Sequence, residues 1–127
     1  MTNILLVGFG GFIGSVLRYL ISGAVQQSMK RLDFPYGTLA VNLIGCFIIG
    51  ILAQYGEVRG AFSNESKAFI FFGLLGGFTT FSSFGNDTVN LVRESFVMNA
   101  LANVGANVAL GLLAVWLGRT ISYLIWR

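Results

Sequence analysis

Three asparagines stand at a helical repeat in an apolar stretch near the C-terminus. Asn99, Asn103 and Asn107 are four residues apart, so on a helix they share one face. Asn42 lies in a separate apolar stretch. An amide NH₂ can donate to an anion, and it can equally join two helices by an interhelical hydrogen bond. The stripe together with Asn42 favours an anion path, with helix contact as the alternative.

A run of glycine and threonine lies near the middle of the third apolar stretch, at Gly76, Gly77, Phe78, Thr79 and Thr80. Glycine and threonine are poor helix formers, so we expect the helix to break there. The carbonyl oxygens freed by a break inside a bilayer need partners. A bound cation is one solution, as at the unwound helices of transporters. A kink packed against small residues of a neighbouring helix is the other.

Two phenylalanines follow this run at a spacing of three. Phe81 and Phe84 therefore share a helix face. The edges of aromatic rings are electropositive, so they can line an anion path without offering a charge that would trap the ion. The chain has 12 phenylalanines, which makes ordinary core packing the alternative for this pair.

The composition limits the class of protein. Of the 127 residues, 55% are hydrophobic and 10% are charged, and mean hydropathy is +0.77. Roughly one residue in four is charged in a soluble domain. A disordered chain, a nucleic-acid binder and an ordinary soluble enzyme are therefore excluded, so no enzymatic activity is expected. The chain has no histidine and a single cysteine, Cys46, which excludes an internal disulfide, a zinc site and histidine-based catalysis.

Four stretches are long enough to cross a bilayer, whose hydrocarbon core takes roughly 20 apolar residues of helix. They cover residues 4–24, 37–55, 68–92 and 99–125. The sequence thus predicts an all-α membrane protein with one domain over residues 1–127, four transmembrane helices and a third helix broken at its centre. Most polar side chains within the stretches fall in the same half of the bilayer. Because buried polar groups in lipid usually face a cavity or a partner, one chain supplies a polar track through only half the membrane.

The charges outside these stretches are balanced. Four crossings put both termini on one side, which carries Arg59, Lys67, Arg119 and Arg127. The other side carries Arg18, Lys30, Arg31 and Arg93. Orientation normally follows an excess of lysine and arginine on the cytoplasmic side, and here there is none. The balance and the half-length track predict an antiparallel homodimer, while a weak orientation bias is the alternative.

Two motifs resemble a known family. GGFTTFSSF at residues 76–84 and PYGTLAVNLIG at residues 35–45, with Leu17-Arg18-Tyr19 at the end of a glycine-rich first helix, are similar to the Fluc family of small bacterial fluoride channels. The resemblance covers essentially the whole chain. It implies a passive fluoride channel of the bacterial inner membrane, with two pores in a dual-topology antiparallel dimer.

The resemblance also implies roles for individual residues. The family's pore phenylalanines correspond to Phe81 and Phe84, and its pore asparagine corresponds to Asn42. Its polar track falls on Asn103, Asn107 and Ser82, and Arg18 matches the arginine of its first helix. Backbone carbonyls of Gly76 and Thr79 would hold a structural Na⁺ on the dimer axis. The chain departs from the family pattern at Phe78, Gly85 and Gly111, and the lost hydroxyls affect the finer details of the fourth-helix track.

Two other classes compete with this hypothesis. A small multidrug exporter has a similar size, four helices and balanced charges, but it needs a membrane-embedded carboxylate in its first helix to couple transport to protons. Residues 4–24 contain no Asp or Glu, and Asp87 lies near the end of the third stretch. A structural helper subunit without transport of its own is the third class.

Overall fold

The computed structural model describes residues 1–31 and 33–127, and these form four long helical rods. The first two rods are the single helices α1 (Thr2–Ser28) and α2 (Tyr36–Arg59). The third rod comprises α3 (Asn64–Lys67), η1 (Ala68–Leu75), α4 (Gly76–Phe78) and α5 (Phe81–Arg93). The fourth comprises α6 (Val97–Gly105), η2 (Ala106–Leu110) and α7 (Gly111–Trp126). Each rod is long and apolar enough to cross a membrane, which confirms the all-α class and the four spans.

Each rod extends beyond the apolar stretch that predicted it, because a helix continues into the polar residues at the membrane surface. The end of α1 shows how such an extension is held. Gln26 donates from Nε2 to the carbonyls of Arg31 and Phe34, at 2.8 and 2.9 Å, and its Oε1 accepts from the Gly37 N–H at 3.0 Å. One side chain therefore ties the connection between α1 and α2 to the helix that precedes it.

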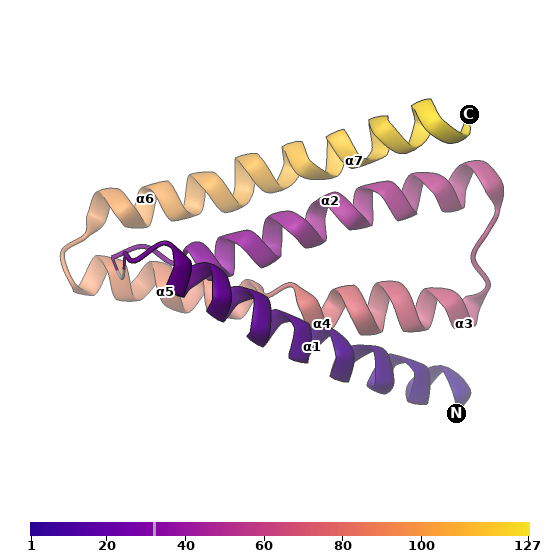
Figure 1. Ribbon diagram of the computed structural model, residues 1–127, viewed down its shortest axis with the longest axis horizontal. Helices are drawn as coiled ribbons and strands as arrows, with labels where there is room; N and C mark the ends of the chain where they lie inside the picture. The colour runs from indigo at the N-terminus through magenta and orange to yellow at the C-terminus, as the bar shows by residue number, and fades with distance from the viewer. Residues whose placement is uncertain (32) are drawn as a thin grey trace.

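The rods pack in pairs, and both termini lie at the same end of the molecule (Figure 1). α2 packs along α7, and α1 packs across η1 and α4. Glycines allow the α1 crossing, because a Cβ at Gly14 would collide with the carbonyl oxygen of Leu74. Gly118 in α7 meets the Phe47 carbonyl of α2 in the same way. Backbones therefore touch directly at both crossings, as small residues permit in membrane helices.

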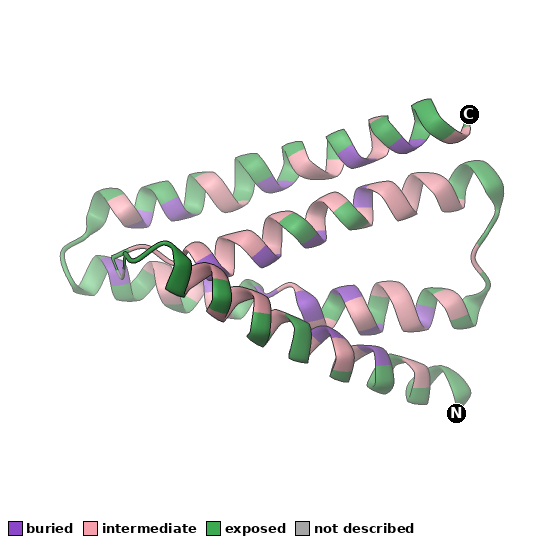
Figure 2. Ribbon diagram, viewed as in Figure 1, coloured by how far each residue is buried: buried purple, intermediate pink, exposed green. Residues whose placement is uncertain are grey.

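Exposed residues lie on the outward faces of the rods (Figure 2), and many of them are large and apolar. Phe9, Phe12, Leu101 and Trp116 are all exposed. The buried apolar residues, Val41, Leu75, Phe78, Phe84 and Leu91, lie between the rods. An apolar exterior around a small core is what a bilayer solvent allows, because lipid tails are as apolar as the side chains they meet. The chain is a multi-pass membrane protein.

The helical backbone of the third rod is interrupted at Thr79 and Thr80. Both residues are extended, with φ/ψ of −85°/159° and −149°/112°. Helix α5 then begins at Phe81, and the Thr80 hydroxyl caps it by accepting from the Ser83 N–H at 3.1 Å. A threonine cap satisfies one of the free N–H groups at a helix start. The chain thus changes direction near the middle of the span and restarts as a well-formed helix.

Candidate functional site

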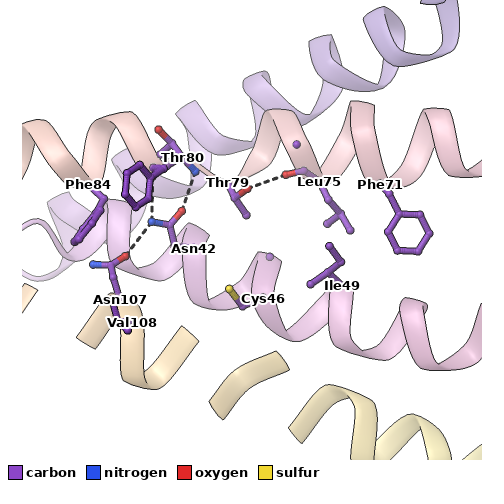
Figure 3. A pocket seen from close by; sticks show the side chains of 13 residues that line it. Asn42, Cys46, Ile49, Phe71, Leu75, Thr79, Thr80, Phe84, Asn107 and Val108 are labelled. Carbon is purple, nitrogen blue, oxygen red and sulfur yellow. Dashed lines mark hydrogen bonds between the residues drawn. The ribbon is translucent and has the colours of Figure 1, made fainter. Parts of the chain in front are cut away.

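A cavity of about 350 Å³ lies beside the interruption, between α2, the third rod and the start of η2 (Figure 3). Its polar wall is formed by Asn42, Thr79, Thr80 and Asn107. Its apolar wall includes Ile49, Phe71, Leu75, Phe81, Phe84 and Val108. The sulfur-bearing side chain of Cys46 also lines it. The cavity is therefore mostly apolar, with a few polar groups gathered at one end.

Asn42 holds the interruption in place. Its Oδ1 accepts from the Thr80 N–H at 2.8 Å, and its Nδ2 donates to the Thr80 carbonyl at 3.2 Å. Thr80 is 7% exposed, so these backbone groups have little access to water. Buried backbone groups must be paired, and here one amide side chain pairs both. The motif around Asn42 and the motif around Thr80 thus meet at one point.

A line of amides continues from Asn42 into the fourth rod. Asn42 Nδ2 donates to Asn107 Oδ1 at 2.9 Å. Asn107 Nδ2 in turn donates to the carbonyl oxygen and to Oδ1 of Asn103, at 2.9 and 3.0 Å. Asn103 is fully buried, and its Nδ2 donates to Thr88 Oγ1 at 2.9 Å. Asn99 does not join the line, because its Nδ2 donates to the Asp33 carbonyl at the α1–α2 connection.

The two phenylalanines stand side by side, with ring centroids 5.3 Å apart and ring planes at 56°. Phe84 is 9% exposed and forms part of the core, whereas Phe81 is 82% exposed. Both line the cavity. In a single chain, Phe81 therefore presents almost its whole ring to the surroundings.

Arg18 and two serines of α5, Ser82 and Ser83, lie on the side of the interruption that faces away from the amide line. Arg18 Nη1 donates to the Thr79 carbonyl at 3.5 Å, the long limit of a hydrogen bond. A second cavity, of about 250 Å³, joins Arg18 to Ser83, Thr80 and Thr38. Ser82 is exposed, with its hydroxyl 3.3 Å from that of Thr80. The structure thus brings Asn42, Asn103 and Asn107 together with the phenylalanines, and it places Arg18 and Ser82 apart from the amide line.

Two backbone carbonyls at the interruption lose their helical donors. In a continuous helix, the Thr80 N–H would bond the Gly76 carbonyl and the Ser83 N–H would bond the Thr79 carbonyl. Here the Thr80 N–H donates to an amide oxygen on α2, and the Ser83 N–H donates to the Thr80 hydroxyl. Gly76 is exposed and Thr79 is half-buried. Neutral carbonyl oxygens at an unwound helix are the kind of ligand that an alkali cation takes, and of these two the Thr79 oxygen already has the Arg18 guanidinium 3.5 Å away.

Sequence reasoning did not single out Thr80, Thr88 or Thr38 as site residues. Thr80, Phe84 and Thr88 are spaced by four, so they share one face of the helix, and that spacing was the available signal. Thr38 donates to Asp87 Oδ2 at 2.8 Å, a pairing between the first turn of α2 and the middle of α5. No regular spacing marks that contact, because its partners are 49 residues apart.

Four apolar rods, an interrupted third rod and a line of hydrogen-bonded neutral amides between the rods define a multi-pass membrane protein. The chain belongs to the CrcB-like family, whose model (CrcB-like protein, Camphor Resistance) matches residues 5–119. The family resemblance of its two motifs is thereby confirmed.

Individual relatives match the chain over nearly its full length. It is 43% identical to the fluoride-specific ion channel FluC 3 of Methanosarcina barkeri, over 96% of this chain and 91% of the relative. It is 43% identical to the fluoride-specific ion channel FluC of Shewanella pealeana, over 97% and 98%. The corresponding channel of Shewanella sp. strain W3-18-1 is 46% identical, again over 97% and 98%.

Proposed function

We propose that this protein is a fluoride channel that lets fluoride leave the cell passively across the bacterial inner membrane. The observation that carries the proposal is the convergence of Asn42, Asn107, Phe81 and Phe84 on one cavity at mid-span. Family membership and the names of the relatives support it. α1 contains no carboxylate, so a proton-coupled exporter of the multidrug type has no residue to carry its proton.

Neutral donors suit the passage of a small anion. Fluoride is strongly hydrated, and it enters a pore only if other donors replace its water. Both protons of Asn42 Nδ2 and both protons of Asn107 Nδ2 already have acceptors. Fluoride therefore enters the line by replacing one of these oxygens, and the electropositive ring edges of Phe81 and Phe84 assist it. Such a site admits an ion without holding it as tightly as a buried cation would.

A second, inverted copy completes the path in this proposal. The amide line, Asn103 included, occupies one half of the fourth rod, and the exposed ring of Phe81 lies at mid-height with nothing covering it in the single chain. An antiparallel homodimer would cover Phe81, and it would join one half-track from each chain to give two equivalent pores. In the proposal Ser82, whose hydroxyl lies 3.3 Å from that of Thr80, belongs to the polar track, and Arg18 is a cation that attracts anions towards it.

A structural Na⁺ forms the last part of the proposal. The carbonyls of Gly76 and Thr79 from two chains would offer four neutral oxygens on the dimer axis. The ion would supply a fixed positive charge that holds the two interruptions together and is not transported. The diverted Thr80 and Ser83 N–H groups support this assignment, because they leave both carbonyls without their usual donors.

Fluoride efflux from liposomes tests the function. Vesicles loaded with fluoride and carrying the purified protein should release it rapidly once a potassium ionophore balances the charge, and vesicles loaded with chloride should not. No fluoride release, or equal release of the two ions, would overturn the proposal. A tag at one terminus tests the inverted arrangement, because a dual-topology population exposes the tag on both faces of the membrane and a parallel one exposes it on a single face.

A further inference from the structure

The amide line forms a one-way chain of donors with fixed ends. From the Thr80 N–H onward, each member accepts from the one before it and donates to the next. The Thr88 hydroxyl ends the chain by donating to the Phe84 carbonyl at 2.8 Å. The route therefore leaves the backbone at Thr80, the cap of α5, and returns to the same helix at Thr88, about two turns later, after crossing α2 and the fourth rod.

The two ends of this chain cannot reverse. The Thr80 N–H can only donate. The Thr88 hydroxyl has one proton, and because that proton is committed to Phe84, its oxygen faces Asn103 as an acceptor. Asn103 must then present Nδ2 to Thr88 and Oδ1 to Asn107. The Thr88 hydroxyl, which lines neither cavity, thus fixes the orientation of the Asn103 amide, and Asn107 is oriented between Asn42 on one side and Asn103 on the other.

We propose that Thr88 is a positioning residue of the ion path, which acts through the buried Asn103 to orient the Asn107 amide; this inference rests on the proposed fluoride channel. When fluoride takes the Asn42 proton in place of Asn107 Oδ1, Asn107 loses its contact with α2. Asn107 is then held in the fourth rod by its two bonds to Asn103, one to the backbone carbonyl and one to Oδ1, and the orientation of that Oδ1 depends on Thr88 as its anchor. Neither Thr88 nor Asn103, which is 0% exposed, needs to touch the ion.

The anchor can be removed by an almost isosteric change. Thr88→Val keeps the shape of the side chain and leaves the buried Asn103 Nδ2 without its acceptor, so the Asn103 Oδ1 that Asn107 uses is no longer held in one orientation. Thr88→Ser keeps the hydroxyl. Thr120 offers a matched control on α7, because its hydroxyl donates to the carbonyl four residues earlier, Trp116, at 2.9 Å and serves no asparagine. Thr120→Val therefore loses the same local bond without touching the line.

The experiment compares initial fluoride efflux per reconstituted chain across a series of fluoride concentrations. We expect Thr88→Val to release fluoride at least about fivefold more slowly than the wild type, because a buried donor loses its acceptor. The efflux rates of Thr88→Ser and Thr120→Val should stay within about twofold of the wild type. In an Asn107→Ala background the Thr88→Val change should have no further effect, because the link to the path is already cut. The inference is overturned if Thr88→Val releases fluoride at the wild-type rate, or if Thr88→Ser slows efflux as much as Thr88→Val does. It is also overturned if Thr88→Val slows efflux in the Asn107→Ala background as much as it does in the wild type.

A second readout does not depend on flux. The side-chain amide ¹⁵N–¹H signals of Asn107 and Asn103 should move in Thr88→Val and stay in place in Thr120→Val. Unchanged signals would refute the anchor even if Asn107→Ala conducts too little fluoride to measure. Wild-type vesicles that release no fluoride would instead refute the channel, and the amide signals would still decide whether the anchor exists.

Discussion

Replacing Asn42 tests whether one side chain both holds the interruption and serves the ion. In Asn42→Ala, the N–H and the carbonyl of the 7%-exposed Thr80 lose their side-chain partners together. Each unpaired buried group costs about 1–3 kcal/mol, so for the two groups we expect the free energy of unfolding to fall by about 2–6 kcal/mol. Asn107 also loses the donor that faces it from α2. Fluoride efflux should fall with stability, because the cavity wall is no longer fixed.

Asn42→Asp separates the two roles. A carboxylate still accepts from the Thr80 N–H, so much of the stability should remain. It can no longer donate to the Thr80 carbonyl or to Asn107, and it adds a negative charge on the proposed anion path. Two like charges 4 Å apart repel by about 4 kcal/mol at an effective dielectric of 20, so efflux should drop at least about tenfold.

Unfolding in mixed micelles of increasing SDS content measures the stability, and vesicle efflux measures the function. An Asn42→Ala protein that unfolds within about 0.5 kcal/mol of the wild type would show that Asn42 does not hold the interruption. Wild-type efflux through Asn42→Asp would refute the idea that neutral donors at this position carry the ion.

Three further outcomes follow from the packing. Gly14→Ala should lower the free energy of unfolding by about 1–3 kcal/mol in the same SDS titration, because the new methyl group collides with the backbone of η1. Gly8→Ala is the control and should not destabilise the protein, because a Cβ at Gly8 meets nothing within 4 Å. Phe84→Ala should cost about 3 kcal/mol as a core deletion, and Phe81→Ala should instead weaken association of two chains, as sedimentation in detergent would report. Arg119→Ala breaks an exposed ion pair of 2.7 Å and should change the unfolding free energy by less than about 1 kcal/mol; a larger loss would show that the pair stabilises the contact between α2 and α7.

Hydropathy predicted the four spans because a bilayer imposes a length on each crossing. The meeting of Asn42 with Asn107 followed from their position in apolar stretches, since a lone amide in lipid needs a polar partner. The direction of their hydrogen bonds could not be predicted, because it depends on Thr88 and Thr80, which come close only in the folded chain. Asn99 has the same spacing as its neighbours, yet it bonds the Asp33 carbonyl, because the first turn of α6 lies against a connection rather than against α5. Gly14 was visible as a small residue, but its contact with Leu74 depends on how α1 crosses the third rod.

The interruption at Thr79 and Thr80 also has an electrostatic consequence. The helical segment over residues 64–78 ends there, and α5 begins at Phe81. A helix carries a partial negative charge at its C-terminal end and a partial positive charge at its N-terminal end. Two poles of opposite sign therefore meet within a few residues of each other, deep in the span. Ending one helix and starting another gives this stretch of backbone an attraction for a cation on one side and for an anion on the other, and the Arg18 guanidinium lies at the Thr79 carbonyl, on the side that attracts a cation.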